Sequence, residues 1–319
     1  MTFAYRLACC LAFALALPLS ATVDAAAPQV KTQAPGYYRM MLGDFEVTAL
    51  SDGSLGLPLS EMLGNTTPAK TAKALSYAYL KEPVETSVNA YLVNTGSKLV
   101  LIDTGTGALF GPKLGFLVAN LKASGYEPEQ VDEVYITHMH PDHIGGLMAG
   151  DKMAFPNAIV RADQHDADYW LNPATLDAAP EDKKGFVKGA VASLNPYVTA
   201  GKFKPFNGDT ELIPGVRAVA AYGHTPGHTI YAVESNGQKL VLWGDLMHVA
   251  ALQFADPTVF LKFDSDSKAA IAQRKKAYAN AAREGYWVGS AHLSFPGLGH
   301  LRAQGKGYAF IPANYSALR

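Results

Sequence analysis

Cysteine is nearly absent from this chain of 319 residues, since it occurs only as Cys9 and Cys10. Both lie in an N-terminal stretch that we expect to be removed, so the mature chain should form no disulfide and offer no thiol nucleophile. A strong net charge is also missing, because 27 Lys and Arg balance 28 Asp and Glu to give a formal net charge of -1. This balance leaves no electrostatic footprint for nucleic acid or an anionic membrane surface, and we expect neither as a partner.

Low complexity, repeats and a high density of charge are lacking as well. Hydrophobic residues make up 49% of the chain and charged residues 17%. These proportions exclude an intrinsically disordered chain, a coiled coil and a fibrous repeat. A chain of this length can bury a core that needs no covalent staple.

The N-terminus has the pattern of a cleavable secretory signal. Arg6 precedes an apolar run over residues 7–19, and small residues follow up to Ala27. The run is shorter than the roughly 20 residues that a membrane-spanning helix needs. We therefore predict a signal peptide over residues 1–27, cleaved after Ala25 or Ala27, and a single domain over 28–319 that is periplasmic or secreted. No later stretch approaches membrane length, so we expect no membrane association after cleavage.

Hydrophobic periodicity predicts two strand-rich halves with helices between and after them. An extended polar lead at 28–38 precedes the first strand. We expect strands at 45–50, 87–93, 98–102, 131–137, 158–161, 216–222, 229–233, 239–243 and 286–291, and helices at 111–126, 164–171, 181–193 and 267–283, before a Gly-rich tail. This order, with no linker between the halves, predicts two packed sheets flanked by helices.

The histidines carry the main chemical signal. All nine lie between residues 138 and 300, and residues 138–143 read His-Met-His-Pro-Asp-His directly after a predicted strand. The first two imidazoles can face one metal ion, while Asp142 and His143, past the Pro141 turn, can face a second. Further ligands must come from elsewhere, and the ends of later strands offer Gly-His, Gly-Asp and Ala-His pairs. A lone His165 or His248 would more often be structural.

The stretch 138–143 resembles the HxHxDH signature of the metallo-β-lactamase superfamily. The pairs at 223–224, 244–245 and 291–292 follow in the order that this family uses, and Asp-Thr-Gly at 103–105 is similar to its early element. The resemblance covers residues 45–300. It implies an α/β fold of the αββα type, with two mixed β-sheets flanked by helices and a dinuclear metal site between them. The segment 243–245 and the tail 291–300 resemble the secreted methyl parathion hydrolase group.

Residue by residue, the resemblance implies seven ligands: His138, His140 and His224 on one ion, Asp142, His143 and His292 on the other, and Asp245 bridging both. His224 is preferred to His228 because the family's ligand precedes the Thr-Pro-Gly turn, and His300 is the reserve for His292. Asp103 is assigned to the support of a ligand or loop. The ligands suit two divalent ions; we expect zinc, although manganese, iron or cobalt accept the same set.

Two such ions lower the pKa of a bridging water, so that a hydroxide nucleophile exists at neutral pH. Asp142 could also steer this water. We expect a secreted metal-dependent hydrolase that cleaves neutral organophosphate triesters. The alternative is a lactonase or arylesterase, acting for example on acyl-homoserine lactones, with promiscuous phosphotriesterase activity. The resemblance also implies a homodimer.

The substrate pocket follows from the same resemblance. Phe110, Trp170 and Phe186 match places where the methyl parathion hydrolase group lines an aromatic pocket, which would favour small uncharged substrates. Ordinary core packing is the alternative for each of the three. Many lactonases of the superfamily place a Tyr three residues after the bridging Asp. Here that residue is His248, which either acts as a donor in its place or lines the entrance.

Four other functions are weighed and disfavoured. Common zinc β-lactamases use a Cys at the position of Asp245 or lack the bridging carboxylate. A glyoxalase-type thioesterase would show a cationic glutathione site and is usually cytosolic, and a nuclease would need a basic surface. A non-catalytic metal-binding protein is disfavoured because a closed structural site usually needs only four ligands.

Overall fold

The computed structural model of the chain describes residues 27–181 and 183–318. The predicted signal peptide, residues 1–27, lies outside the described residues except for Ala27. Residues 27–34 belong to a separate unit in which no helix or strand is described. The helices and strands belong to the unit that begins at Pro35.

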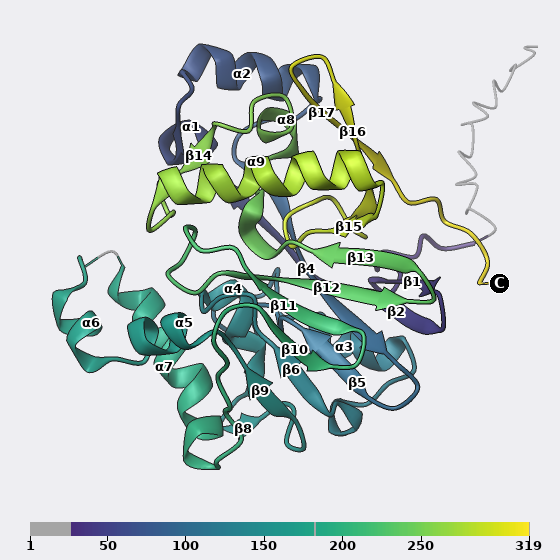
Figure 1. The fold of residues 1–319 in the computed structure, drawn as a ribbon, viewed down its shortest axis with the longest axis vertical. Coiled ribbons are helices and arrows are strands. Elements are labelled where there is room, and N and C mark those ends of the chain that lie inside the picture. The colour runs from purple at the N-terminus through teal and green to yellow at the C-terminus, as the bar shows by residue number, and fades with distance from the viewer. Residues whose placement is uncertain (1–26, 182, 319) are drawn as a thin grey trace, which may run out of the picture. The chain divides into compact units, whose positions relative to one another are not determined.

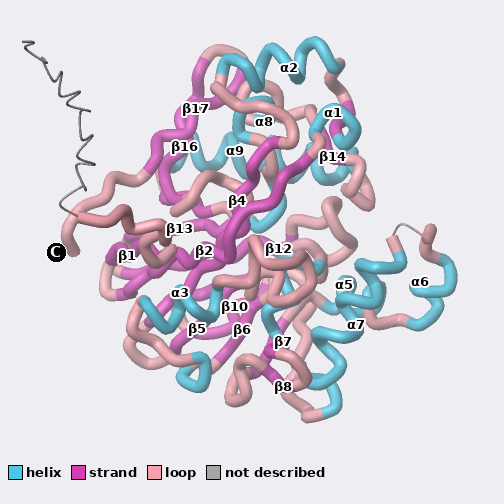
Figure 2. Tube along the Cα trace, turned by 180° about the vertical axis from the view of Figure 1, so that it is seen from behind, coloured by secondary structure: helices cyan, strands magenta, loops and turns pink. Residues whose placement is uncertain are grey.

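Within the described residues, the first β-sheet has six strands in the order β1-β2-β4-β5-β6-β9 (Figure 1). Their bounds are β1 Tyr37–Leu42, β2 Phe45–Leu57, β4 Val84–Asn94, β5 Leu99–Ile102, β6 Glu133–Tyr135 and β9 Ile159–Arg161. Neighbours from β1 to β5 are antiparallel, whereas β5, β6 and β9 are parallel. The paired strands β2 and β4 are the long ones in the view from behind (Figure 2).

The second sheet has seven strands among the described residues, in the order β10-β11-β12-β13-β15-β16-β17. Their bounds are β10 Thr210–Ile213, β11 Val216–Ala220, β12 Thr229–Ser235, β13 Gln238–Leu242, β15 Trp287–Gly289, β16 Leu298–Gln304 and β17 Gly307–Pro312. Only the β13–β15 pair is parallel. The sheet is therefore mixed, like the first.

The remaining elements are helices and short strands that lie between the strands of the two sheets along the chain. The helices are α1 Leu59–Met62, α2 Pro68–Tyr77, α3 Leu117–Ala123, α4 Pro141–Ile144, α5 Gln164–Trp170, α6 Pro173–Ala178, α7 Lys184–Thr199, α8 Ala250–Gln253 and α9 Ser267–Glu284, with 3-10 turns η1 Pro128–Gln130, η2 Gly145–Leu147 and η3 Gly244–Leu246. Two small pairs are β3 Leu63–Gly64 with β14 Phe260–Leu261, and β7 Met148–Ala149 with β8 Lys152–Met153. Across the described part of the chain, no helix is long and apolar enough to cross a membrane.

Three buried clusters show how the layers are stacked. One lies between the two sheets, where Tyr135 of β6 stacks on Tyr231 of β12 with ring centroids 5.6 Å apart. A second joins the outer face of the first sheet to α3 and α7, and a third joins the second sheet to α9 through Tyr278. The order helix, sheet, sheet, helix confirms the predicted αββα sandwich.

The sequence analysis did not predict β1, α2 or β10, and two further differences from the prediction have a local cause. The helix expected at 111–126 is reduced to α3, because Gly111 and Gly115 adopt φ values of +80° and +85° that a right-handed helix does not allow. The Gly-rich tail after residue 291 contains the hairpin β16–β17, which turns at Gly305 with a φ of +61°. Gly299 lets the two strands pack closely, because a Cβ there would lie 2.3 Å from the Ile311 carbonyl oxygen.

Candidate dinuclear metal site

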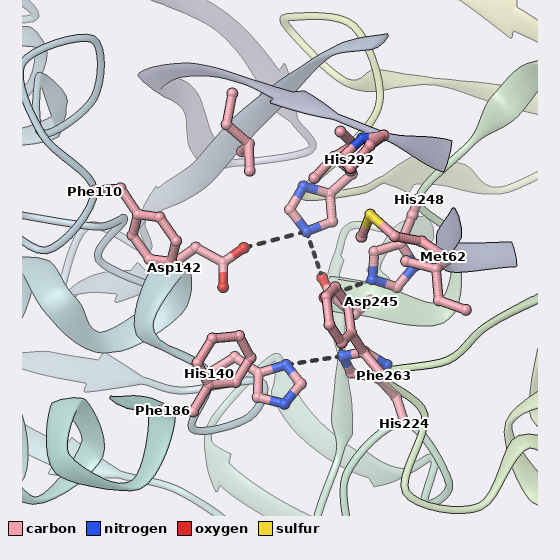
Figure 3. A pocket seen from close by; sticks show the side chains of 14 residues that line it. Met62, Phe110, His140, Asp142, Phe186, His224, Asp245, His248, Phe263 and His292 are labelled. Atoms are coloured by element: carbon pink, nitrogen blue, oxygen red, sulfur yellow. Dashed lines mark hydrogen bonds and ion pairs between the residues drawn. The ribbon is translucent and has the colours of Figure 1, made fainter. Parts of the chain in front are cut away.

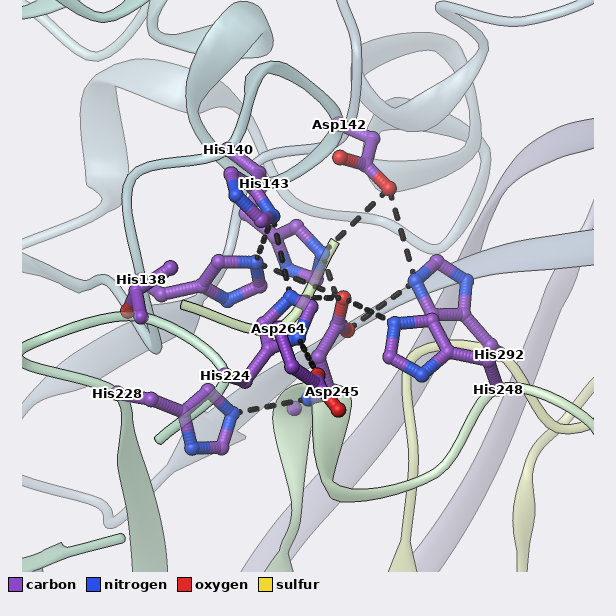
Figure 4. Close-up of polar contacts among 12 residues, drawn as sticks. His138, His140, Asp142, His143, His224, His228, Asp245, His248, Asp264 and His292 are labelled. Carbon is purple, nitrogen blue, oxygen red and sulfur yellow. Dashed lines mark hydrogen bonds and ion pairs between the residues drawn. The ribbon is translucent and has the colours of Figure 1, made fainter. Parts of the chain in front are cut away.

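The predicted ligands lie on loops that leave strands of both sheets. Residues 138–143 follow β6 of the first sheet, and α4 begins at Pro141. In the second sheet, His224 lies between β11 and β12, Asp245 follows β13, and His292 follows β15. These four loops meet at one end of the sandwich (Figure 4).

The ligand atoms fall into two groups that match the predicted division. Within each group the atoms lie within 4.8 Å of one another, and the groups are His138, His140, His224 and Asp245, and Asp142, His143 and His292. A third, overlapping group contains Asp245, His248 and His292. Segments far apart in sequence thus converge on one buried cluster.

Asp245 lies between the two groups, with one oxygen toward each. Its Oδ1 is 3.2 Å from His143 Nε2 and 3.1 Å from His292 Nε2. Its Oδ2 is 3.2 Å from His224 Nε2 and 3.5 Å from His138 Nε2. This is the placement that a bridging carboxylate requires.

Residues outside the cluster bind the ring nitrogens that face away from it. The Nδ1 atom of His143 is 2.8 Å from Asp103 Oδ2, that of His224 is 2.7 Å from Asp264 Oδ1, and that of His292 donates to the Ser87 carbonyl at 2.9 Å. Partners of this kind fix the ring orientation and leave each Nε2 directed at the metal.

Of the two supporting carboxylates, the sequence predicted one and missed the other. Asp103 was predicted to support a ligand or loop, and it contacts His143 while also accepting from the backbone of Thr137 at 2.8 Å. Asp264 was missed. It stands two residues before Asp266, which caps α9, and nothing in the sequence separates the two roles.

Asp166, also missed by sequence reasoning, joins two of the ligand loops. Its carboxylate accepts from Met139 N at 2.9 Å, Gly227 N at 2.6 Å and Thr225 Oγ1 at 3.0 Å. Burial raises its pKa to about 6 despite these three bonds. The first and second sheets are thus tied together beside the cluster.

Burial and close packing set the protonation of the cluster. Burial, reinforced by neighbouring imidazoles, holds the pKa of His138 and of His140 well below the usual range, so both are neutral. Burial alone would raise the pKa of Asp245, but the surrounding imidazoles, His292 and His143 foremost, hold it well below its ordinary value. Neutral imidazole and ionised carboxylate are the forms that bind a metal. Despite burial, the nearby carboxylates, Asp245 above all, raise the pKa of His143, His224 and His292, so these three rings must release a proton when a metal binds.

A divalent metal fits these residues. Among the described residues, His143 Nε2 and Asp245 Oδ1 are buried without a hydrogen-bond partner, although they lie 3.2 Å apart at the centre of the cluster. Buried polar atoms rarely remain unpaired, and metal coordination would satisfy both. Imidazole and carboxylate ligands in this number suit two ions of the zinc type.

The remaining histidines lie outside the two groups. His228 is buried and its pKa falls to about 3, chiefly through desolvation. Its Nε2 accepts from the backbone of Asp245 at 3.0 Å, so it supports that loop. The His300 ring packs at a tilt of 41° against Trp287 with centroids 4.0 Å apart, and His165 Nδ1 lies 2.7 Å from Asp163 Oδ1.

A cavity of about 360 Å³ opens onto the cluster (Figure 3). Besides five residues of the cluster and its neighbour His248, its lining is apolar: Leu55, Leu57, Pro58, Met62, Phe110, Phe186, Leu261 and Phe263. Lys and Arg are missing from the described residues that line it. The cavity therefore suits an uncharged substrate, as the sequence predicted.

Trp170 differs from its predicted place. Phe110 and Phe186 line the cavity, but Trp170 is buried at the end of α5 and packs edge-on against His140, with centroids 5.2 Å apart. It lines a separate, small cavity behind that ring. Phe263, which sequence reasoning did not single out, is the third aromatic ring of the main cavity.

His248 lies between the cavity and the cluster. It lines the cavity, and its Nε2 lies 2.8 Å from Asp245 Oδ2. Its ring stacks on His292 with centroids 5.0 Å apart and planes 20° from parallel. Burial lowers its pKa to about 4, so the ring is neutral.

Two mixed sheets between helices, with histidines and aspartates gathered at the loops of one end, define a class of metal-dependent hydrolases. The family model described as "Metallo-beta-lactamase superfamily" matches residues 83–284. The chain belongs to the metallo-β-lactamase superfamily and is a metal-dependent hydrolase of that fold.

Two solved structures show this likeness over most of the chain. The hydrolase AbOPH of the beta lactamase superfamily is 37% identical, with a TM-score of 0.84 over 90% of this chain and 100% of that one. AidC, a dizinc quorum-quenching lactonase in complex with a product, is 28% identical, with a TM-score of 0.81 over 88% and 99%.

Several curated relatives are N-acyl homoserine lactonases. That of a Bacillus sp is 28% identical over 214 residues, which cover 61% of this chain and 77% of that protein. That of Bacillus cereus is 29% identical over 161 residues, which cover 50% of this chain. The matched region spans only 56% of the Bacillus cereus protein.

Proposed function

We propose that this protein is a lactonase that opens uncharged lactones bearing an apolar acyl or aryl group, N-acyl homoserine lactones among them. The observation that carries the proposal is the cavity, whose floor is the dinuclear cluster and whose walls are wholly apolar. The aliphatic part of the wall, Leu55, Leu57, Met62 and Leu261, suits an acyl chain. The lactonase relatives and AidC support this choice over the phosphotriester that the sequence favoured.

In this proposal the seven residues predicted from sequence hold two divalent ions: His138, His140, Asp142, His143, His224, Asp245 and His292. Such ions supply a hydroxide nucleophile at neutral pH and polarise the carbonyl under attack. The chain's own part is to orient and to exclude water. The apolar walls would desolvate the acyl group, Asp142 would orient the attacking water as a hydrogen-bond acceptor at its cavity-facing carboxylate, and His248 would fix Asp245 through Nε2–H.

Hydrolysis of neutral organophosphate triesters is the second candidate. Three aromatic rings line the cavity above the cluster and would contact an aryl leaving group: Phe110, Phe186 and Phe263. The sequence resemblance to the methyl parathion hydrolase group favours it. Both reactions would use the same nucleophile.

A paired rate assay tests the proposal. On the zinc-replete protein we expect kcat/KM for N-hexanoyl homoserine lactone or an aryl lactone to reach roughly 10⁴ M⁻¹s⁻¹, and to exceed the value for methyl paraoxon at least a hundredfold. His300→Ala, which is remote from the cluster, is the matched control and should keep both rates. The reverse ratio would reject lactone hydrolysis as the main activity and favour the triesterase.

We also infer that the protein acts outside the cytoplasm, as a homodimer. The charge and apolar pattern of residues 1–27 supports export, and the family resemblance supports the dimer. Mass spectrometry of the mature protein should find its N-terminus at Ala26 or Pro28, and sedimentation should give twice the chain mass. An intact Met1 or a monomer would reject the respective part.

A further inference from the structure

One continuous segment, residues 244–264, supplies a whole side of the site. It carries Asp245 and His248 at its start, and Leu261, Phe263 and Asp264 at its end. Its regular structure consists only of the short elements η3, α8 and β14. Regular secondary structure therefore fixes only part of its conformation, and buried side chains must support the rest.

Gln253 provides part of that support from inside the segment. Its side chain is fully buried, and its Oε1 accepts from His248 N at 2.8 Å and Val249 N at 2.9 Å. Its Nε2 donates to the Val259 carbonyl at 3.0 Å. One amide thus joins the two ends of the segment.

Arg274, in the middle of α9, binds the segment 244–264 through its guanidinium. Its guanidinium is fully buried and donates to three carbonyls, those of Leu246, Pro257 and Val259. A charge buried this deeply is costly unless it is paired, and the three carbonyls only partly compensate it. The remaining compensation must come from an anion.

Asp264 is that anion, and it connects Arg274 to a ligand. Arg274 Nη2 lies 4.0 Å from Asp264 Oδ2, a buried oxygen without a hydrogen-bond partner among the described residues. The other oxygen of the same carboxylate is 2.7 Å from His224 Nδ1. A chain of contacts therefore runs from α9 through Asp264 to the cluster.

We propose that Arg274 is a positioning residue for the metal site: from within α9 it fixes the segment 244–264 and the Asp264 carboxylate, so that His224 and Asp245 are held in the geometry that binds metal. The inference rests on the dinuclear site of the proposed function but not on its substrate. Arg274 touches no substrate and is not a catalytic residue.

Metal binding by the full chain, measured without substrate, tests this inference. We expect Arg274→Met to weaken zinc binding 10- to 100-fold in competition with a chelator, and to alter the visible absorption of the cobalt-substituted protein. Arg274→Lys should recover part of the affinity, because it restores the charge but not the three fixed donors. Arg283→Met is the matched control, since Arg283 lies exposed on the same helix, and it should change neither readout.

If the Arg274→Met variant does not fold, a double-mutant cycle still tests the proposal. Arg274→Lys and Asp264→Asn should weaken zinc binding by less in combination than the product of their separate effects, because both act on one contact. Zinc affinity within twofold of the wild type with an unchanged cobalt spectrum, or effects that simply multiply, would overturn the proposal even if the melting temperature fell. Failure to hydrolyse lactones would leave these measurements untouched.

Discussion

At the scale of single residues, four buried carboxylates hold the ligands and their loops in place. Asp245 faces both ligand groups, Asp103 and Asp264 orient imidazoles from outside, and Asp166 joins the loops that carry the ligands. Each is buried, so each must be satisfied by donors or cations. Two of them differ in pKa: imidazoles hold the pKa of Asp245 well below its ordinary value despite burial, whereas burial raises the pKa of Asp166 to about 6.

Asp166 should make the protein more stable as the pH falls from 7 to 5. Its pKa is about 6 in the folded chain against an ordinary 3.8, so the folded state binds the proton more readily within that window. Stability from this group is therefore gained below pH 6 and lost above it, by about 1 kcal/mol between pH 7 and pH 5. Unfolding free energies of the wild type and Asp166→Asn should diverge by this amount. A constant difference would contradict the prediction.

His248→Phe should lower lactone kcat/KM about tenfold without removing metal. Phenylalanine keeps the stacking on His292 but loses the Nε2–H bond to Asp245, and a bond to a charged group is worth about 1.5 kcal/mol. Steady-state kinetics with zinc analysis would measure the effect. His248→Gln, which restores a donor, should recover part of the rate; full activity in the Phe variant would show that the bond is dispensable.

At the scale of elements, the site depends on where the strands end and on how the helices pack against the ligand-bearing loops. Gly223 precedes His224 with a φ of +142°, and the first turn of α9 packs directly on it. A Cβ at this position would lie 2.3 Å from Ala270 N. The N-terminus of α9 can approach His224 so closely only because residue 223 lacks a side chain.

Gly223→Ala should therefore destabilise the fold by at least about 2 kcal/mol and weaken zinc binding, because α9 or His224 must move. Gly285→Ala is the control. Gly285 also has a positive φ, +70°, but nothing lies within 4 Å of its absent Cβ, so about 1 kcal/mol is expected with unchanged zinc affinity. Denaturant unfolding and chelator competition measure both variants, and equal effects would refute the packing argument.

Sequence predicted the strands that carry ligands because alternating apolar residues and the dense histidine motif are local signals. It could not predict Asp166, Asp264 or Arg274, whose partners lie far along the chain and whose residue types are common on surfaces. It also placed Trp170 in the substrate pocket, since sequence position does not tell which side of His140 an indole occupies. The prediction of a helix over 111–126 was wrong in its first part for a local reason, because Gly111 and Gly115 adopt left-handed conformations.

At the scale of the whole molecule, neither sheet holds a complete set of ligands. The first supplies residues 138–143, and the second supplies His224, Asp245 and His292. Strand β4 of the first sheet also orients His292 through the Ser87 carbonyl. Metal binding should therefore stabilise the contact between the sheets, and through it the fold.

Chelation should lower stability and abolish activity together. With free zinc a thousandfold above its Kd, binding adds about 4 kcal/mol to the free energy of unfolding, which the apoprotein loses. His140→Ala should behave like the apoprotein in zinc content and turnover. Thermal unfolding with and without chelator, followed by zinc addition, checks this. Full turnover after exhaustive dialysis against chelator would contradict the metal mechanism.

The segment 244–264 contributes both to the cavity wall and to the support of the ligands, but the wall residues on β2 and α1 support no ligand. Imidazoles are oriented by Asp103, Asp264 and the Ser87 carbonyl, whereas the aliphatic wall is built on the end of β2, α1 and the β3–β14 pair. Natural selection can therefore exchange Leu55 or Met62 for another side chain while the hydrolytic centre stays intact. A lineage with this architecture can acquire new substrates through single substitutions, and closely related members should differ in specificity before they differ in metal chemistry.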